Sequence, residues 1–553
     1  MRNAQYIAGA GNRKSERAYV MYVIEVQNLP RSKDSRHLLV FNYKKRRITM
    51  NDNNLKYVGK REKSDIFQMT KWGEINWEKA EKYVNRLQIR IVKAKLMNKK
   101  NLVKRLQYLL VNSFYAKAIA VRKVTTNKGR KSAGIDGEIW NTEKLKMQGI
   151  LKLNNKGYKA KPTRRIYIKK ANGKQRPLSI PTMTDRAMQT LHLLALQPIE
   201  ETQADKGSFG FRMYRGCQDA MQRIFNVLSR KNSAEWILEG DIKGCFDNIS
   251  HEWLINNIEM NKKVLKEFIK AGYVYKKKLF PTNQGAIQGG AISPTLANIT
   301  LDGLEEEIHR KTNPGKRVKH LVHREHKINF IRFADDFIVT GETKEILEEV
   351  KQIIKEFLQE RGLELSEEKT LITNIKEGFD FLGWNFRKYK DNKLIIKPSK
   401  KSVKRVREKM NKTIKQAASW KQEELITKLN PIITGWSNYH QVVCAKETFK
   451  KLDYTLYLML TEWARRRHNK KSRVWRYNRY WKNINGRNET FEQNGKILNR
   501  FADVPIIRKY RIALDKNPYL NREYYQTIKL AQKRRRDNAY RKTAVYELGY
   551  NNL

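Results

Sequence analysis

The sequence predicts an α+β protein built from several domains. Stretches in which apolar residues recur every three or four positions alternate with short β-prone runs that end at turn residues. A chain of 553 residues is too long for one ordinary core, so three or four domains or subdomains are expected. Beyond residue 400 the pattern is helical and basic, with 36 Lys and Arg against 13 Asp and Glu in residues 401–553.

The charge balance is the strongest global feature of the chain. Lys and Arg number 115 against 56 Asp and Glu, which gives a net charge of +59 and a pI near 10.1. Such an excess repels itself in a free protein, so a polyanionic partner is predicted. No apolar run approaches the ~20 residues that span a bilayer, and the N-terminus lacks the apolar core of a secretory signal. A transit segment for an organelle remains an alternative.

The three cysteines, Cys217, Cys245 and Cys444, are isolated from one another in the sequence. They indicate neither a disulfide framework nor a thiolate zinc site, and they favour a reducing compartment. The segment "HLVHREH" contains His320, His323 and His326. Because its flanks are basic and no fourth ligand is evident, a solvated or phosphate-facing loop is preferred to a metal site.

The N-terminal half reads as helices followed by a hairpin. Residues 1–65 are basic and weakly patterned, and no element is assigned to them. "RRIYIKKANGKQRPLSIPT" predicts two strands joined by an Asn-Gly turn, and "MTDRAMQTLHLLALQPIEE" predicts a buried helix that ends near Pro198. Before them, two long basic helices are predicted from two sets of apolar positions at helical spacing: Val84, Leu87 and Ile91, then Leu102, Leu106 and Leu109.

The middle of the chain reads as strands and helices in alternation. "EWILEGDIKGCFDNISHEWL" predicts a strand that leads into a helix capped by Ser250, and "INFIRFADDFIVTG" predicts strand, turn and strand. "KEILEEVKQIIKEFLQERG" is typical of an amphipathic helix ending at Gly362. "FDFLGWNFRKY" and "KLIIKPS" predict a last hairpin, after which we expect a separate, RNA-facing module.

Two adjacent carboxylates, Asp335 and Asp336, interrupt an apolar run, where unpaired carboxylates are costly to bury. Asp241 follows another apolar strand, "WILEG", so the fold could bring all three together. Three carboxylates converging at strand ends would hold hard divalent ions, with Mg²⁺ favoured. Two such ions about 4 Å apart support in-line phosphoryl transfer, which indicates nucleotidyl transfer. For an Asp-Asp pair alone, the alternative is an ordinary surface turn.

An ordered set of motifs carries a family resemblance. "DIKGCFDNI", "QGGAISPTLANI", "RFADDF", "GLELSEEKT" and "FLGW" occur in the order found in reverse transcriptases. With "SFGFRMYRGCQDAM" and "KLNPIITGWSNYH", the chain resembles the group II intron-encoded reverse transcriptase/maturase family over roughly residues 70–530. The resemblance implies a right-hand polymerase (fingers, palm, thumb) with a helical, basic C-terminal maturase domain. Phe333 stands where the family commonly has Tyr. Phenylalanine keeps the aromatic ring of tyrosine and lacks only its hydroxyl.

The resemblance also implies a division of the chain. The expected parts are an unassigned basic N-terminal segment (1–65), the N-terminal helical part of the reverse transcriptase (66–135), the fingers/palm reverse transcriptase domain (136–395), the thumb/maturase domain X (396–500) and a basic C-terminal DNA/RNA-binding tail (501–553).

Catalytic roles follow from the same resemblance. Asp241, Asp335 and Asp336 would hold two Mg²⁺ ions, with Mn²⁺ as an alternative metal. Lys369 is a candidate general acid for the leaving pyrophosphate; the alternative is a solvated lysine paired with Glu367 or Glu368. Phe246 would be the aromatic gate that excludes the sugar 2′-hydroxyl and selects deoxynucleotides, with a core phenylalanine as the alternative.

The resemblance also implies residues that bind the nucleotide and the primer. Lys169 and Arg176 would clamp the incoming triphosphate, with Lys170 competing for the role of Lys169. Gln288 would lie near the nucleotide sugar. Leu382 and Gly383 belong to "FLGW", which resembles a primer-grip hairpin. Asp247 is expected to order the turn after Asp241 rather than to bind metal.

In the C-terminal module, "WARRRHNKKSRVWRYNRYW" interleaves cations with aromatics, as suits phosphates and unstacked bases of structured RNA. An amphipathic helix with a buried face explains part of this pattern. No Cys follows Cys444, so we expect no His-Asn-His endonuclease and a primer taken from elsewhere, such as nascent DNA. The RNA-binding residues expected here are Arg465, Arg466, Arg467, Arg473, Arg476 and Arg479.

The predicted function is RNA-directed DNA synthesis by a protein that binds a group II intron RNA, assists its splicing and copies it during retrohoming. The expected partners are that RNA, a DNA target and primer, and dNTPs, without a membrane. The expected location is the bacterial cytoplasm, or an organelle matrix or stroma in a eukaryote. The alternatives are a splicing-only maturase with an inactive polymerase, and a domesticated or defence-associated reverse transcriptase with another RNA partner.

Overall fold

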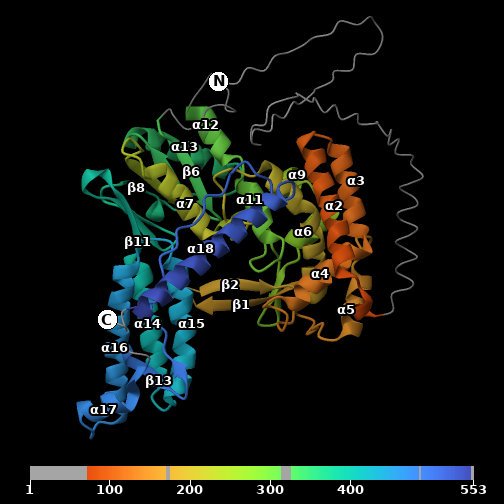
Figure 1. Cartoon of the computed structure of the whole chain (residues 1–553). Coiled ribbons are helices and arrows are strands. Elements are labelled where there is room, and N and C mark those ends of the chain that lie inside the picture. The colour runs from red at the N-terminus through yellow and green to blue at the C-terminus, as the bar shows by residue number, and fades with distance from the viewer. Residues whose placement is uncertain (1–70, 170–172, 174, 313–325, 485–486, 550–553) are drawn as a thin grey trace, which may run out of the picture. The chain divides into compact units, whose positions relative to one another are not determined.

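The computed structural model describes residues 71–169, 173, 175–312, 326–484 and 487–549. Helices and sheets follow one another along this part of the chain (Figure 1), which confirms the α+β prediction. The segment 1–65 and the histidines His320 and His323 lie outside the described residues, whereas His326 is exposed. No helix of the described ranges is both long and apolar enough to cross a bilayer.

Three helices, not two, open the described chain and pack on one another. The unpredicted one is α4, whose first turn is capped by Ser113, because the Ser113 Oγ accepts a hydrogen bond from the Ala116 amide. In α3 the buried residues include Val103 and Leu110, whereas Leu102 is exposed. Of the three predicted positions, Leu106 is buried and Leu109 packs against the core, so only Leu102 faces solvent. The bounds are α2 (Trp77–Leu96), α3 (Lys100–Asn112), α4 (Phe114–Thr126) and α5 (Glu143–Lys152).

Helix α6 (Met183–Gln203) is buried along most of its length. The predicted end near Pro198 is wrong, because the helix continues through this proline to Gln203. A proline inside a helix leaves the carbonyl four residues earlier without its intrahelical partner. That carbonyl, of Leu194, accepts a hydrogen bond of 2.8 Å from the Gln88 side chain on α2. A long-range contact therefore satisfies the group that the proline leaves unpaired.

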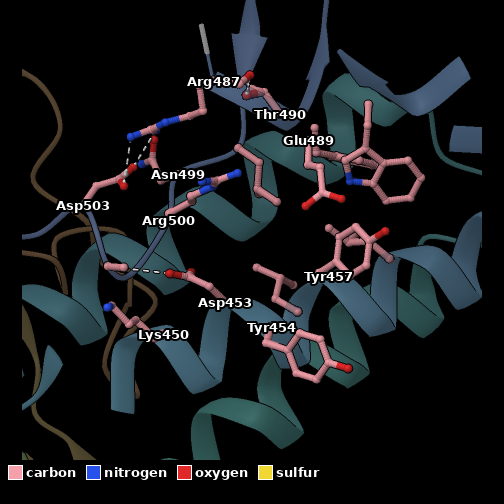
Figure 2. Close-up of a pocket in the computed structure, with 16 residues that line it drawn as sticks. Lys450, Asp453, Tyr454, Tyr457, Arg487, Glu489, Thr490, Asn499, Arg500 and Asp503 are labelled. Atoms are coloured by element: carbon pink, nitrogen blue, oxygen red, sulfur yellow. Dashed lines mark hydrogen bonds and ion pairs between the residues drawn. The ribbon is translucent and has the colours of Figure 1, made fainter. Parts of the chain in front are cut away.

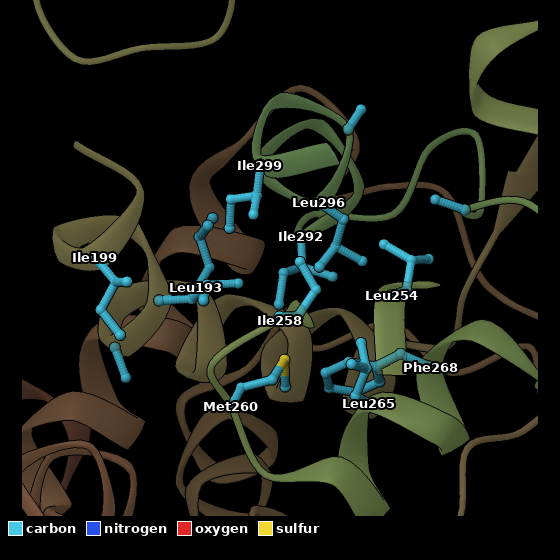
Figure 3. Close-up of a cluster of buried hydrophobic side chains, with 14 of the residues drawn as sticks. Leu193, Ile199, Leu254, Ile258, Met260, Leu265, Phe268, Ile292, Leu296 and Ile299 are labelled. Atoms are coloured by element: carbon cyan, nitrogen blue, oxygen red, sulfur yellow. The ribbon is translucent and has the colours of Figure 1, made fainter. Parts of the chain in front are cut away.

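Helix α6 also lies in the main hydrophobic core, which Figure 3 shows in part. Leu193 and Ile199 from α6 belong to the same buried cluster as Leu254, Leu265 and Ile292, which come from later segments. The helices that follow α6 in the chain are α7 (Cys217–Leu228), α8 (Cys245–Asn248), α9 (His251–Asn257), α10 (Lys262–Ile269), α11 (Ser293–Leu301) and α12 (Leu304–Thr312).

A four-stranded sheet in the order β2-β1-β4-β5 follows the predicted hairpin. β1 and β2 pair antiparallel, as predicted, and β1 pairs with β4 in parallel. The strands are β1 (Thr163–Lys169), β2 (Gln175–Ile180), β4 (Tyr273–Tyr275) and β5 (Lys278–Phe280).

A second four-stranded sheet, in the order β6-β7-β3-β8, has only antiparallel pairs. The predicted strand–turn–strand unit forms β6 and β7, and β3 lies between β7 and β8. Ser250 caps α9, as predicted, and α13 packs on β3 and β7, ending at Gln359, three residues before the expected Gly362. The bounds are β3 (Trp236–Asp241), β6 (Asn329–Phe333), β7 (Asp336–Gly341), α13 (Lys344–Gln359) and β8 (Leu371–Asn374).

The last predicted hairpin is a three-stranded antiparallel sheet in the order β11-β10-β9. Its strands are β9 (Phe379–Phe381), β10 (Trp384–Lys388) and β11 (Leu394–Pro398). The extra strand β9 precedes the "FLGW" turn, so this turn joins two paired strands.

The C-terminal region is mainly helical, but a small sheet, β12-β13-β14, interrupts it and was not predicted. The signal was present, because two Asn-Gly pairs, at 485–486 and 494–495, flank the segment that forms β13. The bounds are α14 (Lys400–Gln416), α15 (Gln422–His440), α16 (Lys446–Arg467), α17 (Arg473–Tyr480), β12 (Trp481–Ile484), β13 (Arg487–Gln493), β14 (Lys496–Ile497) and α18 (Arg522–Gly549).

The C-terminal region packs against earlier parts of the chain, and its predicted role as a separate RNA-facing module stays a prediction. One hydrophobic cluster joins Met221 of α7 and Ile331 of β6 to Met410 of α14 and Phe449 of α16. All described residues accordingly fall within one compact unit, inside residues 60–553. The segment before α18 also returns to earlier parts of the chain: Asn517 donates a hydrogen bond to the Glu201 carbonyl at 3.2 Å.

Candidate active site

The register of the β6-β7-β3-β8 sheet brings two of the predicted carboxylates together. Asp241, the last residue of β3, is the direct partner of Asp336, the first residue of β7. Phe333 pairs with Asp336, so Ala334 and Asp335 form a two-residue turn between β6 and β7. The antiparallel pairing of β3 with β7 therefore brings together carboxylates that lie 94 positions apart in the sequence, Asp241 and Asp335.

Buried groups fix the shape of this turn. Ala334 has a φ of 59°, which hairpin turns of types I′ and II′ require and which L-residues rarely adopt. A Cβ on Gly210 would lie 2.3 Å from the Ala334 nitrogen, so only glycine permits this close backbone approach. Beneath the turn, the fully buried Arg332 pairs with Asp302 at 2.6 Å and donates a hydrogen bond to the Asn298 side chain at 3.2 Å.

Three carboxylates and one ammonium group lie close together at this edge of the sheet. Burial, together with the neighbouring Asp335 and Asp241, raises the pKa of Asp336 to about 7. Lys369 Nζ lies 2.5 Å from Asp241 Oδ2, and this hydrogen bond raises the pKa of Lys369. Among the described residues, no three His, Cys, Asp or Glu side chains converge closely enough to hold a metal ion.

The alternative pairing of Lys369 with neighbouring glutamates is wrong. Glu367 instead forms ion pairs with Lys351 at 3.2 Å and Lys355 at 2.7 Å, both on α13. Lys369 therefore faces the edge that carries Asp241. Its role as general acid stays a prediction.

Polar contacts link the β1–β2 hairpin to the segment after Asp241. Arg176 Nε donates a hydrogen bond to Gln288 Oε1 at 3.2 Å, and Gln288 Nε2 donates to Asp247 Oδ2 at 3.0 Å. The adjacent Phe246 is half-buried, with its ring in an edge contact to Phe211 at 6.4 Å. Asp247 thus orients Gln288, a role that the sequence did not indicate.

The register of the hairpin separates the two residues expected to clamp the triphosphate. Lys169 pairs with Gln175, whereas Arg176 pairs with Ile168. Side chains alternate between the faces of a strand, so Lys169 and Arg176 project from opposite faces of the hairpin. Lys170, the alternative to Lys169, lies outside the described residues.

The "FLGW" turn is held by a helix of the C-terminal region. Leu382 and Gly383 both have positive φ, of 50° and 81°, as a two-residue hairpin turn requires. Tyr439 on α15 donates its hydroxyl to the Leu382 carbonyl at 2.8 Å, and its ring stacks on Trp384 at 4.6 Å. The sequence indicated the turn but not the residue that supports it.

The six arginines predicted to bind RNA are not equivalent. Arg467 donates to the carbonyls of Ala418 and Trp420, at 3.1 and 2.7 Å, and Arg476 donates to the His468 carbonyl at 3.1 Å. These two guanidinium groups tie helix ends to neighbouring segments, so part of their hydrogen-bonding capacity is used inside the protein.

The other four arginines are exposed. Arg465 and Arg466 share the carboxylate of Glu462, at 2.7 and 2.8 Å, in the last turns of α16. Arg473 and Arg479, on α17, form no ion pair within the described residues. Of the predicted set, these two are the cations most available to a phosphate.

Most aromatics of the same stretch do not face solvent. Trp463, Tyr480 and Trp481 are buried in the hydrophobic cluster of the C-terminal region. Trp475 is exposed. The expectation that these aromatics stack on RNA bases is therefore wrong for the buried three, which have a structural role.

Models of three protein families match successive parts of the chain. The N-terminal domain of reverse transcriptase matches residues 72–153, reverse transcriptase (RNA-dependent DNA polymerase) matches residues 168–386, and the group II intron maturase-specific domain matches residues 403–481. The second match contains Asp241, Asp335 and Asp336, and the third covers most of α14 and all of α15 and α16.

Individual relatives agree with these matches. The group II intron-encoded protein LtrA of Lactococcus lactis is 31% identical over 445 residues, which cover 64% of this chain and 72% of LtrA. Maturase-like protein 1 of Euglena gracilis is 26% identical, over 71% of this chain and 82% of the relative. A solved structure of telomerase from Candida albicans with a fragment of telomeric RNA has a TM-score of 0.34 and 13% identity, covering 55% of this chain and 59% of that chain.

Proposed function

The chain belongs to the group II intron-encoded reverse transcriptase/maturase family, and we propose that its polymerase centre lies at the β3–β7 edge, with Asp241, Asp335 and Asp336 as catalytic residues. It is an RNA-directed DNA polymerase with a right-hand fold and a maturase function in intron splicing. The observation that carries the site assignment is the register pair of Asp241 and Asp336, next to the turn that bears Asp335.

The family depends on divalent metal ions, and the residue types at this edge suit them, whereas the side chains of the described residues do not converge on one metal position as they stand. The side chains are all carboxylates, the ligands that hard cations prefer, and Lys369 alone of the described cations pairs with one of them. We assign two Mg²⁺ ions, with Mn²⁺ as a substitute, to Asp241, Asp335 and Asp336. When bound, the metal would supply charge stabilisation to the attacking and leaving oxygens of the phosphoryl transfer.

The chain's own residues then select and orient the substrates. Phe246, half-buried beside Asp247, leaves no room for a 2′-hydroxyl under its ring. Arg176 offers a guanidinium fork to the triphosphate, and Gln288, held by Asp247, meets the sugar. Lys169, on the other hairpin face, is retained as a phosphate contact that requires the hairpin to twist or close.

The remaining roles concern the primer and the leaving group. The turn at Leu382 and Gly383, fixed by Tyr439, holds the primer strand close to the catalytic edge. Lys369, protonated at neutral pH, would act as the general acid that transfers its proton to the departing pyrophosphate. The 3′-hydroxyl of the primer attacks the α-phosphorus, and the bond to pyrophosphate breaks as the new phosphodiester forms.

Its partner is RNA, and we assign a group II intron RNA that the protein helps to splice and copies during retrohoming. The DNA target and primer, and dNTPs, complete the set. The reaction would take place where the intron-bearing genome is held, in a bacterial cytoplasm or an organelle matrix or stroma. The division at residues 65, 135, 395 and 500 is retained as the functional division of the chain.

Primer extension on an RNA template tests the site. Asp336→Asn keeps the size of the side chain and removes its charge, and we expect a loss of about 10²–10³-fold or more in rate. Asp391→Asn is the matched control, because Asp391 lies in an exposed turn at φ 64°, which Asn also adopts. Extension by Asp336→Asn at the rate of the control would overturn the assignment.

A further inference from the structure

Two adjoining pockets hollow the surface of the C-terminal region between α16 and β13. Their volumes are about 480 Å³ and 410 Å³, each within the ~300–1,000 Å³ of typical ligand sites. They share Tyr457, Trp481 and Glu489, and so form one continuous groove; Figure 2 shows the larger pocket. None of the site residues assigned to the polymerase centre lines it.

One face of α16 forms the floor of the groove. Lys450, Tyr454 and Tyr457 line the first pocket, and Thr461 and Ala464 continue the same face into the second. These positions recur at three and four residues, which places them on one side of a helix. The Tyr454 side chain is 64% exposed, so its ring offers an open face for stacking.

A β-bulge directs a carboxylate into the groove. The pairing of β12 with β13 shifts register between Lys482 and Ile484, and Glu489 has a φ of 57°. Bulges with a left-handed residue redirect side chains out of the regular pleat. Figure 2 shows the Glu489 carboxylate pointing into the pocket, between the β13 wall and Tyr457.

The carboxylates around Glu489 are already occupied. Asp453 accepts the amides of Phe501 and Ala502 at 2.8 and 2.9 Å, and Asp503 pairs with Arg487 at 2.9 Å. Glu489 makes no hydrogen bond or ion pair within the part of the chain that the structure describes. Glu489 is exposed, so its two oxygens are open acceptors at the surface of the groove.

Cations flank both ends of this acceptor. Arg500 uses one N–H on the Asn488 carbonyl, at 3.2 Å, and projects into the first pocket in Figure 2; Lys450 on α16 lines the same pocket. Arg473 and Arg476 line the second pocket. Positive groups at both ends of an aromatic floor match a chain with a phosphate at each step and a planar ring between them.

We propose that this groove binds an unpaired stretch of RNA and accepts a guanine base in the pocket of Tyr454 and Glu489. Among the four bases, only guanine carries two adjacent donors, N1–H and N2–H, on its Watson–Crick edge, and these match the two oxygens of a carboxylate. Uracil, cytosine and adenine each offer a single donor position there. The phosphates on either side of the guanosine contact Arg500 and Lys450 at one end, and Arg473 at the other.

This proposal rests on the proposed function, since it names an RNA contact of the maturase region. A protein segment is the alternative occupant. The +59 net charge and the cations at both ends favour a polyanion, and the mixture of a base acceptor with phosphate donors favours a nucleic acid with unstacked bases.

The test uses the full chain and four eight-nucleotide RNAs: octauridylate and its variants with one central G, A or C. Fluorescence anisotropy at fixed salt measures each affinity. Binding through charge alone is equal for all four, because each carries the same phosphates. We expect the G-containing RNA to bind about 10-fold more tightly than the others; equal affinities would overturn the proposal.

A pair of variants locates the preference. Glu489→Gln replaces one acceptor with a donor and is expected to bring the affinity for the G-containing RNA down to that of octauridylate. Glu447→Gln removes the same charge from an exposed pair with Lys451 outside the groove, and is expected to keep the preference. A preference that survives Glu489→Gln would contradict the proposal.

Crosslinking gives a readout that does not depend on variant folding. The central G is replaced by 6-thioguanosine, irradiated on the wild-type protein and mapped by mass spectrometry. We expect adducts on Tyr454 or Tyr457, and adducts confined to another region would exclude the groove. Wild-type protein that extends a primer without these adducts would refute the groove alone, whereas wild-type protein without extension would refute the polymerase assignment.

Discussion

The catalytic edge of the β6-β7-β3-β8 sheet and the basic surface of the C-terminal helices differ in how closely their sequence patterns correspond to their structures. At the catalytic edge, Asp241 and Asp336 face each other because strand register leaves them no other position. In the C-terminal region, Arg467 bonds to backbone carbonyls and Trp463 lies in the core. An ordered motif therefore predicts which residues lie together, whereas a stretch rich in arginine and aromatic residues overstates how many of them can reach a ligand.

The largest expected effect tests whether buried charge supports the catalytic edge. Arg332→Met leaves the buried Asp302 without its partner, and we expect a loss of about 3–5 kcal/mol in the free energy of unfolding. Urea unfolding followed by circular dichroism measures it. Arg310→Met, which removes an exposed ion pair with Glu307, should leave the unfolding curve unchanged. Equal urea unfolding curves for the two variants would show that the buried Arg332–Asp302 pair does not stabilise the fold.

A comparable effect would show that the aromatics of the C-terminal region are structural. Trp463→Ala empties a core site and removes the indole hydrogen bond to the Ala417 carbonyl, with an expected cost of about 3–5 kcal/mol. Trp475→Ala, at an exposed position, should change stability little. Thermal and urea unfolding of both variants decide the point, and a small loss for Trp463→Ala would restore the interpretation of these rings as RNA contacts.

A smaller effect concerns the catalytic turn. A methyl group on Gly210 cannot be placed without moving the backbone of Ala334, so Gly210→Ala should displace the turn that bears Asp335. Misplacement by about 1 Å can cost about 10²-fold in rate. Single-turnover primer extension measures this loss. Gly435→Ala, where an added Cβ meets no atom within 4 Å, is the control, and equal rates for the two variants would argue against turn support by Gly210.

A moderate effect of pH on the free energy of unfolding is expected from His440, which lies beside Tyr439, the residue that holds the "FLGW" turn. Burial lowers the pKa of His440 from 6.5 to about 3, while the unfolded chain keeps the ordinary value. The stability from this group is present above pH 6.5 and is lost as the pH falls toward 3. We expect unfolding free energy to fall by about 1–2 kcal/mol between pH 6.5 and 5.

His440→Gln should flatten part of this dependence, measured as urea midpoints at each pH. The remaining slope has a source in α6, because burial also lowers the pKa of His192, to about 4. Identical slopes in wild-type protein and His440→Gln would exclude His440 as a contributor.

The smallest expected effect separates the available arginines from those already used. Arg473→Ala and Arg479→Ala should each reduce the salt dependence of RNA binding by about one phosphate contact. Arg467→Ala should change this slope less, because its guanidinium bonds to the Ala418 and Trp420 carbonyls. Equal changes in the salt slope for the three variants would indicate that all three arginines contact RNA alike, as the composition of the stretch alone predicts.

The sequence predicted those features that one strand or one motif determines. The β1–β2 hairpin, the β6–β7 turn and the Ser250 cap are confirmed because neighbouring residues decide them. Features that depend on distant groups were missed. Helix α6 continues through Pro198, and Gln88 on α2 binds the freed Leu194 carbonyl; no local pattern contains that contact.

The same limit applies to the candidate site. The three aspartates were named from spacing and resemblance, and their roles stay predictions until they are tested. The opposite faces of Lys169 and Arg176 follow from register, which a list of motif residues does not include. The bond from Gln288 to Asp247 and the contact of Tyr439 with Leu382 join segments far apart in the chain, so they became visible only in the structure.

The most direct test of the central claim is to crosslink the protein to RNA in its native host, purify it and sequence the bound RNA. A maturase and polymerase of this family should enrich a single intron that carries the protein's own reading frame. Enrichment of a different structured RNA, or of a broad mixture without such an intron, would contradict the account and assign the polymerase to another RNA partner.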